Sequence, residues 1–564
     1  MIATAFLTSI QDGSLLRSLP RNIIAGLTVG IVALPLSMGL AIASGVPPQH
    51  GLYTAIVGGF IIALAGGSRV NISGPTAAFV VILLPVVQQY GTGGLLISGM
   101  LAGGILICLG LLRVGRFIQA IPYPVVIGFT AGIGTVIALL QMKDLMGLRP
   151  ESAGLHFLDK VWLYVMSLHT LQWQEVLIGL STLLLLVLWK RMSSRIPGYL
   201  VALVWGTLIA LGFNSIDTLP AVETIASRFS FSIGDITGSG IPPLAPSWTL
   251  PWQLPGPDGE PVGLSIELFQ ILFQAAFAIA ILGALESLLC SLVADGMTGE
   301  QHDPDSELLG QGIGNVVVPF FGGIPVTAAI ARTALNIRAG GSTPVAAIVH
   351  SLFVLIAILF LAPVLSLIPM AAMAAVLVIV AWNMSEANHV IHLIRKAPRS
   401  DVAVFLTCYI LTVLVDMQIA IAAGMVLASV MFIRRMSELS SATLTSDHSA
   451  HTHGETGPGV IIYDVNGPLF FGAAHKALKV ISAIDREVHS VVLDMSDVPV
   501  IDTTAMVNLR SIADLLSGRN IRLYLLNAQD RIEKKMRRFG LDADGSKLTI
   551  IRNLDEITRH EHLG

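Results

Sequence analysis

Residues 322–330 read GGIPVTAAI, and residues 70–79 read VNISGPTAAF. In each stretch a Thr-Ala-Ala triplet follows glycine and proline, which interrupt helices, and leads into another apolar run. Each stretch is the third apolar element of its half of a long apolar region. Broken segments at matching positions of two halves are typical of inverted repeats, in which they meet at a central binding site. The alternative interpretation is that the triplet recurs by chance and that the glycines only let helices pack.

The 564-residue chain is too apolar to be a soluble globule. Apolar residues make up 54% of it and charged residues only 12%, about half of the charge of an ordinary soluble protein. The net charge of −4 gives no indication of a nucleic-acid partner. The three cysteines lie in apolar runs, which predicts buried core residues and neither disulfides nor a metal site. The sequence holds no P-loop, Rossmann fingerprint or nucleophile elbow, so we predict no enzyme and no cofactor.

The apolar runs predict an α-helical polytopic membrane domain over residues 1–437. They divide into fourteen transmembrane segments, a 7+7 inverted repeat around the loop 214–262. The predicted segments are 22–43, 51–67, 74–90, 93–115, 121–142, 174–190, 197–213, 263–294, 308–321, 325–338, 343–362, 366–383, 401–415 and 417–437. Several are shorter than the ~20 residues of a straight crossing, which is tolerated where protein or a cavity satisfies the backbone.

The distribution of basic residues predicts the orientation of these segments. With the N-terminus in the cytoplasm, thirteen Lys and Arg residues flank the cytoplasmic ends, against four on the external side. This asymmetry follows the positive-inside rule. Both termini are therefore expected in the cytoplasm.

The end of the chain has a different composition. Residues 438–456 are polar and rich in histidine and chain breakers, which predicts a linker. Residues 457–564 alternate β-like and helical runs, which predicts a small α/β domain. A metal site at His448, His451 and His453 is weakly suggested, and the flexible setting favours an ordinary polar tract.

Two ionisable residues fall inside predicted spans. Arg332 lies in the first turns of the second broken segment, and Glu286 lies in the run FAIAILGALESLLCSLVAD. Charged groups at such depth are costly and mark functional sites unless they are paired. Arg332 could bind an anionic substrate with its planar fork, or form a structural salt bridge with Glu286. Glu286 could carry a proton, or only satisfy Arg332 or a helix N-terminus, whereas His350 is expected to be a packed, hydrogen-bonded histidine.

At this point the motifs resemble those of a known family, the SulP (sulfate permease, SLC26-like) anion transporters, along essentially the whole chain. The motifs that carry the resemblance are AGLTVGIVALPLSMGLAIASGVPPQHGLYT (25–54), NISGPTAA (71–78), LLCSLVADGMTG (288–299), ELLGQGIGN (307–315) and GGIPVTAAIARTALNIRAGGSTPVAAIVH (322–350). The end of the chain resembles a STAS domain, with DMSDVPVIDTTAM at 494–506. Within the family, the segments 51–69, 73–83 and 380–387 look most like the bacterial C4-dicarboxylic acid transporter branch.

The resemblance implies a secondary active transporter in a bacterial inner membrane that works by elevator-like alternating access as a homodimer. The branch implies succinate, fumarate, malate or aspartate as substrate. Protons are expected to be the coupled ion. The alternatives are bicarbonate or sulfate uptake by the same fold, a gated anion channel, and a membrane-anchored scaffold that signals through its STAS domain. If the protein were such a scaffold, its central site would not be used, and Arg332→Ala would leave its function unchanged.

The resemblance also implies the site residues. Substrate contacts carried over by motif are Ser37, Thr76, Ala77, Thr327, Ala328, Ala329 and Arg332. Glu286 occupies the position that binds sodium in the bicarbonate relatives, which have aspartate there and a hydroxyl in place of Cys290. Because a hard oxygen ligand is missing, protons are favoured over sodium, and no metal is predicted.

In the STAS-like region, Asp502, Thr503 and Thr504 open a predicted helix. Helix capping explains them by itself. The family resemblance suggests in addition a regulatory hydroxyl and a cytoplasmic protein partner on this face, although Ala505 replaces the usual glycine.

Overall fold

The computed structural model describes residues 2–118, 121–150, 157–189, 191–192, 197–233, 236–415, 417–439, 441–444, 459–469, 488–541, 547–554 and 556–557. The chain divides into two compact units, Met1–Met425 and Val426–Gly564. Eight helices of the described part are long and apolar enough to cross a membrane, or nine if one bent pair counts as a single span.

The first half of the membrane unit contains the first seven predicted segments. In chain order its elements are α1 (Thr4–Gln11), α2 (Ser14–Arg17), α3 (Leu19–Ala43), α4 (Pro48–Tyr53), η1 (Thr54–Gly58), α5 (Gly59–Ala65), β1 (Ser73–Gly74), α6 (Ala77–Leu111), α7 (Gly115–Ile118), α8 (Tyr123–Leu140), α9 (Met142–Met146), α10 (Phe157–Met166), η2 (Ser167–Thr170), α11 (Trp173–Trp189) and α12 (Gly198–Asn214). The predicted third and fourth segments both lie in α6, which breaks at Gly91 with φ 68° and ψ −173°. A backbone of this kind suits glycine.

The connection between the halves is not featureless. It contains α13 (Ile225–Arg228), the antiparallel hairpin of β2 (Ser230–Ile233) and β3 (Ile236–Ser239), and η3 (Pro251–Gln253). Trp248 stacks on Phe320 with ring centroids 4.9 Å apart, which fixes the connection to the second half.

The second half contains the other seven predicted segments. Its elements are α14 (Ile266–Thr298), α15 (Pro304–Val317), η4 (Val318–Phe321), β4 (Thr327–Ala328), α16 (Ile330–Arg338), α17 (Val345–Leu365), α18 (Met370–Met384), α19 (Ala387–Lys396), α20 (Arg399–Leu414) and α21 (Met417–Leu439). Each of the fourteen predicted segments thus overlaps at least one described element, and the predicted fold class is confirmed.

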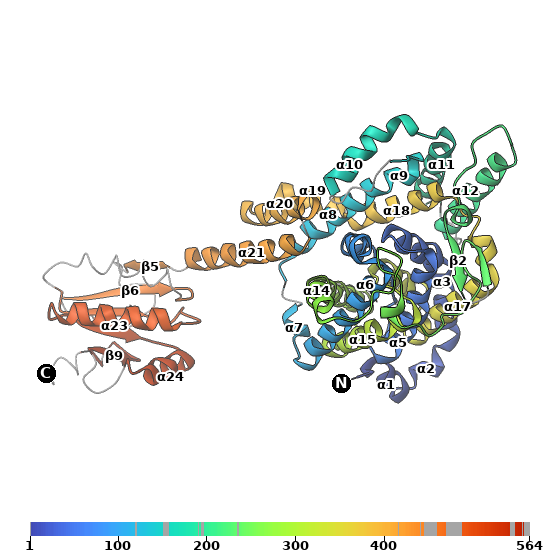
Figure 1. Cartoon of the computed structure of the whole chain (residues 1–564). Coiled ribbons are helices and arrows are strands. Elements are labelled where there is room, and N and C mark those ends of the chain that lie inside the picture. Colours follow the sequence, from blue (N-terminus) through green and yellow to red (C-terminus); the bar gives the residue numbers. More distant parts are fainter. Residues whose placement is uncertain are drawn as a thin grey trace. The chain divides into compact units, whose positions relative to one another are not determined.

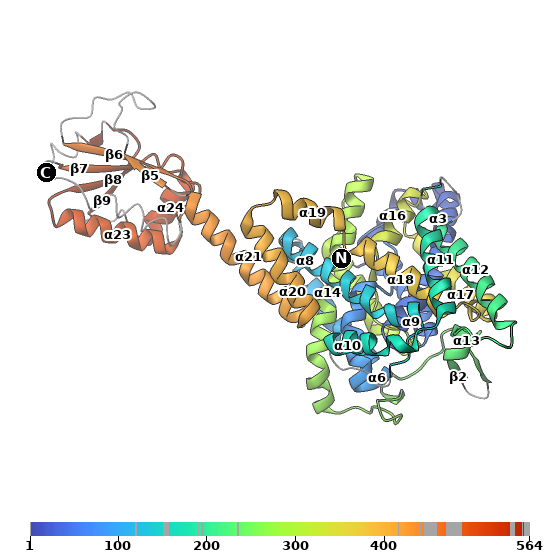
Figure 2. The same ribbon diagram turned by 90° about the horizontal axis from the view of Figure 1, so that it is seen from above.

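The two halves interlock instead of forming separate bundles. Helices α14 and α15 of the second half pack on α6, α17 packs on α3, and α20 packs on α8 (Figures 1 and 2). The largest buried cluster accordingly joins α6 residues such as Phe79 and Leu83 to α14 residues such as Ile279 and Leu282. Neither half can therefore bury its apolar surface without the other.

The second unit contains a five-stranded sheet of β5 (Ser441–Leu444), β6 (Val460–Asn466), β7 (Ser490–Asp494), β8 (Arg522–Leu526) and β9 (Leu548–Ile551), in that order. Strand β5 is antiparallel to β6, and the other neighbours are parallel. Helices α23 (Thr503–Ser517) and α24 (Asp530–Phe539) bury their apolar sides against one face of the sheet, with Leu493 and Leu525 in the shared core.

The predicted linker 438–456 needs a correction. Its residues Ser441–Leu444 form β5, whose backbone pairs with Tyr463–Asn466 of β6. An edge strand needs only one neighbour and no long apolar run, so composition did not reveal it. Residues 445–456, including the three-histidine tract, lie outside the described residues.

Candidate functional site

The two Thr-Ala-Ala stretches lie side by side in the structure. Strand β1 pairs with β4 in antiparallel register, Ser73 opposite Ala328 and Gly74 opposite Thr327. Each strand stays extended because a proline is near: Pro75 disfavours helix at Gly74, and Pro325 lies two residues before β4 begins at Thr327. The predicted residues Thr76, Ala77, Thr327, Ala328 and Ala329 are thereby brought together.

A helix begins directly after each of these strands. Helix α6 begins at Ala77 and α16 at Ile330, and neither residue that precedes its helix, Thr76 or Ala329, caps it through a side chain. The first N–H groups of a helix have no partner within the helix and carry partial positive charge. Two such ends next to one strand pair make the region suited to an anion.

Helix α14 supplies the hydroxyl and carboxyl partners of this strand pair. The Thr76 hydroxyl donates to Glu286 Oε1 at 2.5 Å. The Ser287 hydroxyl lies 2.6 Å from that of Thr327 and accepts a hydrogen bond from the Ala328 amide at 3.2 Å. Helix α14 therefore holds the start of each half-helix through two consecutive residues.

Arg332 lies on α16 with only 3% of its surface exposed. Its Nη2 donates to the Pro75 carbonyl at 2.5 Å, whereas its buried Nη1 has no hydrogen-bond partner among the residues that the structure describes. A Cβ atom at Gly74 would lie 2.3 Å from this Nη1, so the guanidinium fits against β1 only because residue 74 is glycine. One side of the fork is thus available to a ligand.

The considered salt bridge between Arg332 and Glu286 is not formed. Glu286 Oε1 accepts from Thr76, while Glu286 Oε2 and Arg332 Nη1 are buried and find no partner in the described part of the chain. The physical reason is that each charged group bonds to the stretch before α6: the Pro75 carbonyl accepts from Arg332, and the Thr76 hydroxyl donates to Glu286. A buried charged group costs free energy unless hydrogen bonds or an opposite charge satisfy all of its polar atoms. In a structural ion pair Arg332 and Glu286 would satisfy each other, and here they do not.

Two further residues named in the sequence analysis, Ser37 and His350, are buried, and their side chains make no hydrogen bond to a described residue. Ser37 on α3 is fully buried, and its hydroxyl has no partner among the described residues. His350 is packed as predicted, since the ring is fully buried, but the predicted hydrogen bond is wrong, because neither ring nitrogen has a partner among the described residues. The adjacent Ser351 takes the nearby acceptor, the Ala55 carbonyl, at 3.0 Å.

Sequence reasoning singled out Cys290 but not Asn71, Ser291 and Thr333, which form a hydrogen-bonded group with it. The Asn71 amide donates to Ser291 Oγ at 2.8 Å, and the Cys290 thiol lies 3.2 Å from Thr333 Oγ1. The Thr333 hydroxyl in turn accepts from the Ile72 amide. Cys290 lies one helical turn after Glu286, and Thr333 directly follows Arg332, so nearness to these two charged residues is the signal that could have pointed to this group.

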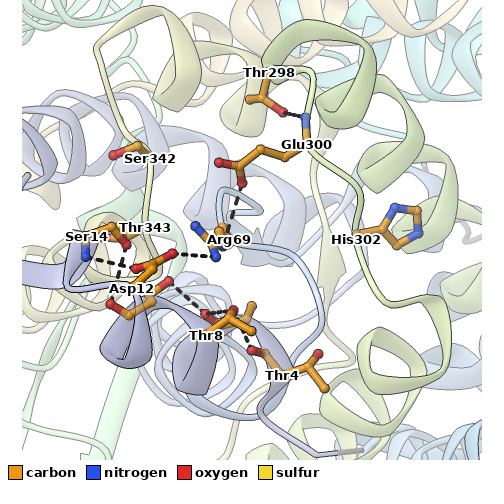
Figure 3. Close-up of polar contacts among 12 residues, drawn as sticks. Thr4, Thr8, Asp12, Ser14, Arg69, Thr298, Glu300, His302, Ser342 and Thr343 are labelled. Carbon is orange, nitrogen blue, oxygen red and sulfur yellow. Dashed lines mark hydrogen bonds and ion pairs between the residues drawn. The ribbon is translucent and has the colours of Figure 1, made fainter.

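A second polar cluster surrounds Arg69, in the loop before β1. Figure 3 shows its guanidinium between two carboxylates, Asp12 at 2.7 Å and Glu300 at 3.7 Å. These residues come from the loop between α1 and α2 and from the chain after α14. The cluster therefore ties the N-terminal helices to both loops at this end of the unit.

In the second unit Asp502 caps α23. Its Oδ1 accepts from the Ala505 amide at 2.7 Å, so capping accounts for this residue. The neighbouring Thr503 and Thr504 are exposed. The described residues contain no group of three or more His, Cys, Asp or Glu side chains that could hold a metal ion.

A polytopic helical unit whose halves meet at paired half-helices has the architecture of a membrane transport protein. A family model described as the sulfate permease family matches residues 19–437, and one described as a STAS domain matches residues 454–557. The chain belongs to the sulfate permease family.

Curated relatives cover nearly the whole chain. The putative sulfate transporter YvdB of Bacillus subtilis is 37% identical over 548 residues, 96% of this chain and 98% of that protein. The bicarbonate transporter BicA of Picosynechococcus sp. is 28% identical over 554 residues, 93% of this chain and 91% of that protein.

Solved structures share the fold. The structure titled "The overall structure of SLC26A9" has a TM-score of 0.81 at 17% identity and covers 99% of this chain and 94% of that one. The transmembrane domain of a cyanobacterial BicA has a TM-score of 0.62 at 27% identity and covers 72% of this chain and 98% of that one.

Proposed function

We propose that this protein is a secondary active transporter of small anions and binds its substrate between β1–α6 and β4–α16. The observation that carries the proposal is the antiparallel pairing of β1 with β4, which sets two uncapped helix starts beside the unpartnered Arg332 Nη1. Helix N-termini and an arginine fork both favour an anion. The names of the relatives, which refer to sulfate and bicarbonate, support the same class of substrate.

The site residues have distinct roles in this proposal. Arg332 Nη1 attracts the anion, and the amides at the starts of α6 and α16 receive its oxygen atoms. The hydroxyls of Thr76 and Thr327 lie at the same two ends and can reorient toward the ligand. Ser37 completes the site from α3.

Two kinds of substrate fit this chemistry. Sulfate and bicarbonate are favoured by the relatives. A C4-dicarboxylate such as succinate, fumarate, malate or aspartate is favoured by the motifs at 51–69 and 380–387. All of them present the oxygen atoms that Arg332 would bind, so uptake has to decide between them.

The coupled ion is proposed to be a proton carried by Glu286. A dianion that enters against 100 mV costs about 4.6 kcal/mol, twice the ~2.3 kcal/mol of one charge, so uptake needs at least two cations to cancel the electrical work. Glu286 Oε2 is unpartnered and can accept one proton. Cys290 offers no oxygen ligand, and its thiol is directed to Thr333 and Asn71, which disfavours sodium.

We further propose that the protein acts as a homodimer in a bacterial inner membrane, with both termini in the cytoplasm and an elevator-like movement. The exposed Thr503 and Thr504 beside Asp502 are the candidate regulatory hydroxyls of the STAS domain. The basic distribution along the chain supports the orientation.

The test is uptake into proteoliposomes of labelled sulfate, bicarbonate and succinate, each with imposed proton or sodium gradients. We expect saturable uptake and counterflow of one of these anions, lost in Arg332→Ala. Arg338→Ala, an exposed arginine on the same helix, is the matched control and should retain both. Non-saturable flux without counterflow would indicate a channel, and unchanged uptake by Arg332→Ala would refute the site.

A further inference from the structure

A polar stripe runs along the otherwise glycine-rich helix α15. Glu307, Gln311 and Asn315 are spaced four residues apart, so they lie along one face. All three are buried, with at most 1% of their surface exposed. They belong to the motif ELLGQGIGN, and the proposed transport mechanism has not used any of them.

Glu307 holds the chain that leads into β1. Its Oε2 accepts from the amides of Gly67 and Ser68 at 3.0 and 3.1 Å. Its Oε1 accepts from Asn71 Nδ2 at 2.9 Å and from Gln311 Nε2 at 3.3 Å. Four donors satisfy this buried carboxylate, which is how such a charge is tolerated.

Gln311 acts on β1 itself. Its Nε2 lies 3.3 Å from the Ser73 hydroxyl, on the strand residue opposite Ala328. The same amide nitrogen donates to Glu307. Gln311 therefore connects Glu307, which holds the loop before β1, to the strand β1 itself.

Asn315 holds the chain that leads into β4. Its Oδ1 accepts from the Val326 amide at 2.9 Å, and its Nδ2 donates to the Val326 carbonyl at 2.8 Å. A neighbouring strand would make the same two backbone hydrogen bonds. They lie at Val326, directly before Thr327. The stripe thus contacts the approaches to both strands, although they are about 250 residues apart in sequence.

We propose that Glu307, Gln311 and Asn315 are positioning residues, through which the single helix α15 holds both strands of the anion site in place. Because α15 is a single rigid element, it sets the placement of β1 and β4, and hence the distance between the starts of α6 and α16 that the anion has to span. The inference rests on the proposed anion site and identifies what fixes its geometry.

The experiment compares Gln311→Met, Ser73→Ala and the double variant in the full-length protein. Both single variants remove the hydrogen bond between Gln311 and Ser73 and change volume little, and Gln311→Met also removes the hydrogen bond to Glu307. We expect each to raise the KM for the transported anion by up to about tenfold, the factor that one hydrogen bond corresponds to, with the maximal rate per folded transporter retained. The double variant should be no worse than the more affected single variant, because the shared contact is lost only once.

Asn22→Ala is the matched control for Asn315→Ala. Asn22 is fully buried, and its Oδ1 accepts from the Ser342 and Thr343 amides in a loop that leads to α17. Both variants remove a side-chain clamp on a loop and should lower thermal stability. Only Asn315→Ala should raise the KM.

Hydrogen exchange of the amides in 67–74 and 324–329 gives a readout that needs no substrate. We expect faster exchange in the first segment for Gln311→Met and in the second for Asn315→Ala, and no change there for Asn22→Ala. If the wild type moves none of the tested anions, the proposed function fails, and exchange still decides whether α15 holds the strands. Unchanged exchange, or an unchanged KM in a variant whose strand has loosened, overturns the positioning role.

Discussion

Gly74→Ala is expected to disable the anion site by displacing Arg332. The new Cβ would lie 2.3 Å from Arg332 Nη1, whereas carbon and its neighbours are in comfortable contact at about 3.5 Å. The guanidinium therefore has to move by about 1.2 Å, the difference between the two distances. Since residue 74 has no positive φ, alanine fits the backbone and the effect is confined to the contact.

The displacement matters because Arg332 has little freedom to compensate. Its side chain is 3% exposed, and its Nη2 is held by the Pro75 carbonyl, one residue after the mutated position. A misplacement of about 1 Å in a binding group can cost up to about a hundredfold in a reaction that depends on it. We expect the KM for the transported anion to rise by about ten- to a hundredfold.

The assay is concentration-dependent uptake into proteoliposomes, normalised to folded protein by size-exclusion chromatography. Gly104→Ala is the matched control, since a Cβ at this α6 position meets no atom within 4 Å. It should transport like the wild type. A KM for Gly74→Ala within twofold of that of the wild type, in well-folded protein, would refute the claim that Arg332 binds the substrate from its place against β1.

Three other predictions follow from individual residues. Glu286→Gln should abolish the stimulation of uptake by an inward proton gradient while counterflow persists; a gradient response equal to that of the wild type would contradict proton transfer by Glu286. Hydrogen bonds from Ser14 and the ion pair with Arg69 lower the pKa of Asp12 from 3.8 to about 2. Because the folded-state pKa is the lower one, this contribution is complete at neutral pH and is lost as the pH falls from about 4 toward 2. Hydrogen exchange in residues 4–17 should rise over this range, whereas Asp12→Asn should show the rise already at pH 7. Asp502→Ala should cost α23 about 1 kcal/mol, seen as faster exchange at Ala505, while Asp502→Asn keeps the cap and should behave like the wild type.

Much of the fold could be read locally. Helix breakers and apolar runs gave all fourteen segments, because the length of an apolar run and the proline and glycine that end it are properties of neighbouring residues. The cap at Asp502 followed for the same reason. Strand β5 was missed because its partner, and not its own composition, makes it a strand.

The hydrogen-bond partners of the buried polar groups could not be predicted from neighbouring residues in the sequence. A salt bridge between Glu286 and Arg332 was one of the alternatives, yet Glu286 Oε1 accepts from the hydroxyl of Thr76, 210 positions away. His350 was expected to be hydrogen-bonded and has no partner. Each outcome depends on which of several donors and acceptors the packed helices bring within about 3 Å.

The sequence by itself determined that this is a polytopic membrane protein of two related halves, each with a broken third segment, followed by an α/β domain. Tertiary structure alone decided that the two broken segments pair as β1 and β4, that Arg332 keeps one nitrogen unpartnered, and that one face of α15 holds both strands. The physical reason is one of range. Breakers and hydropathy act over a few residues, whereas the pairing of buried polar groups is fixed only when segments hundreds of residues apart have packed together.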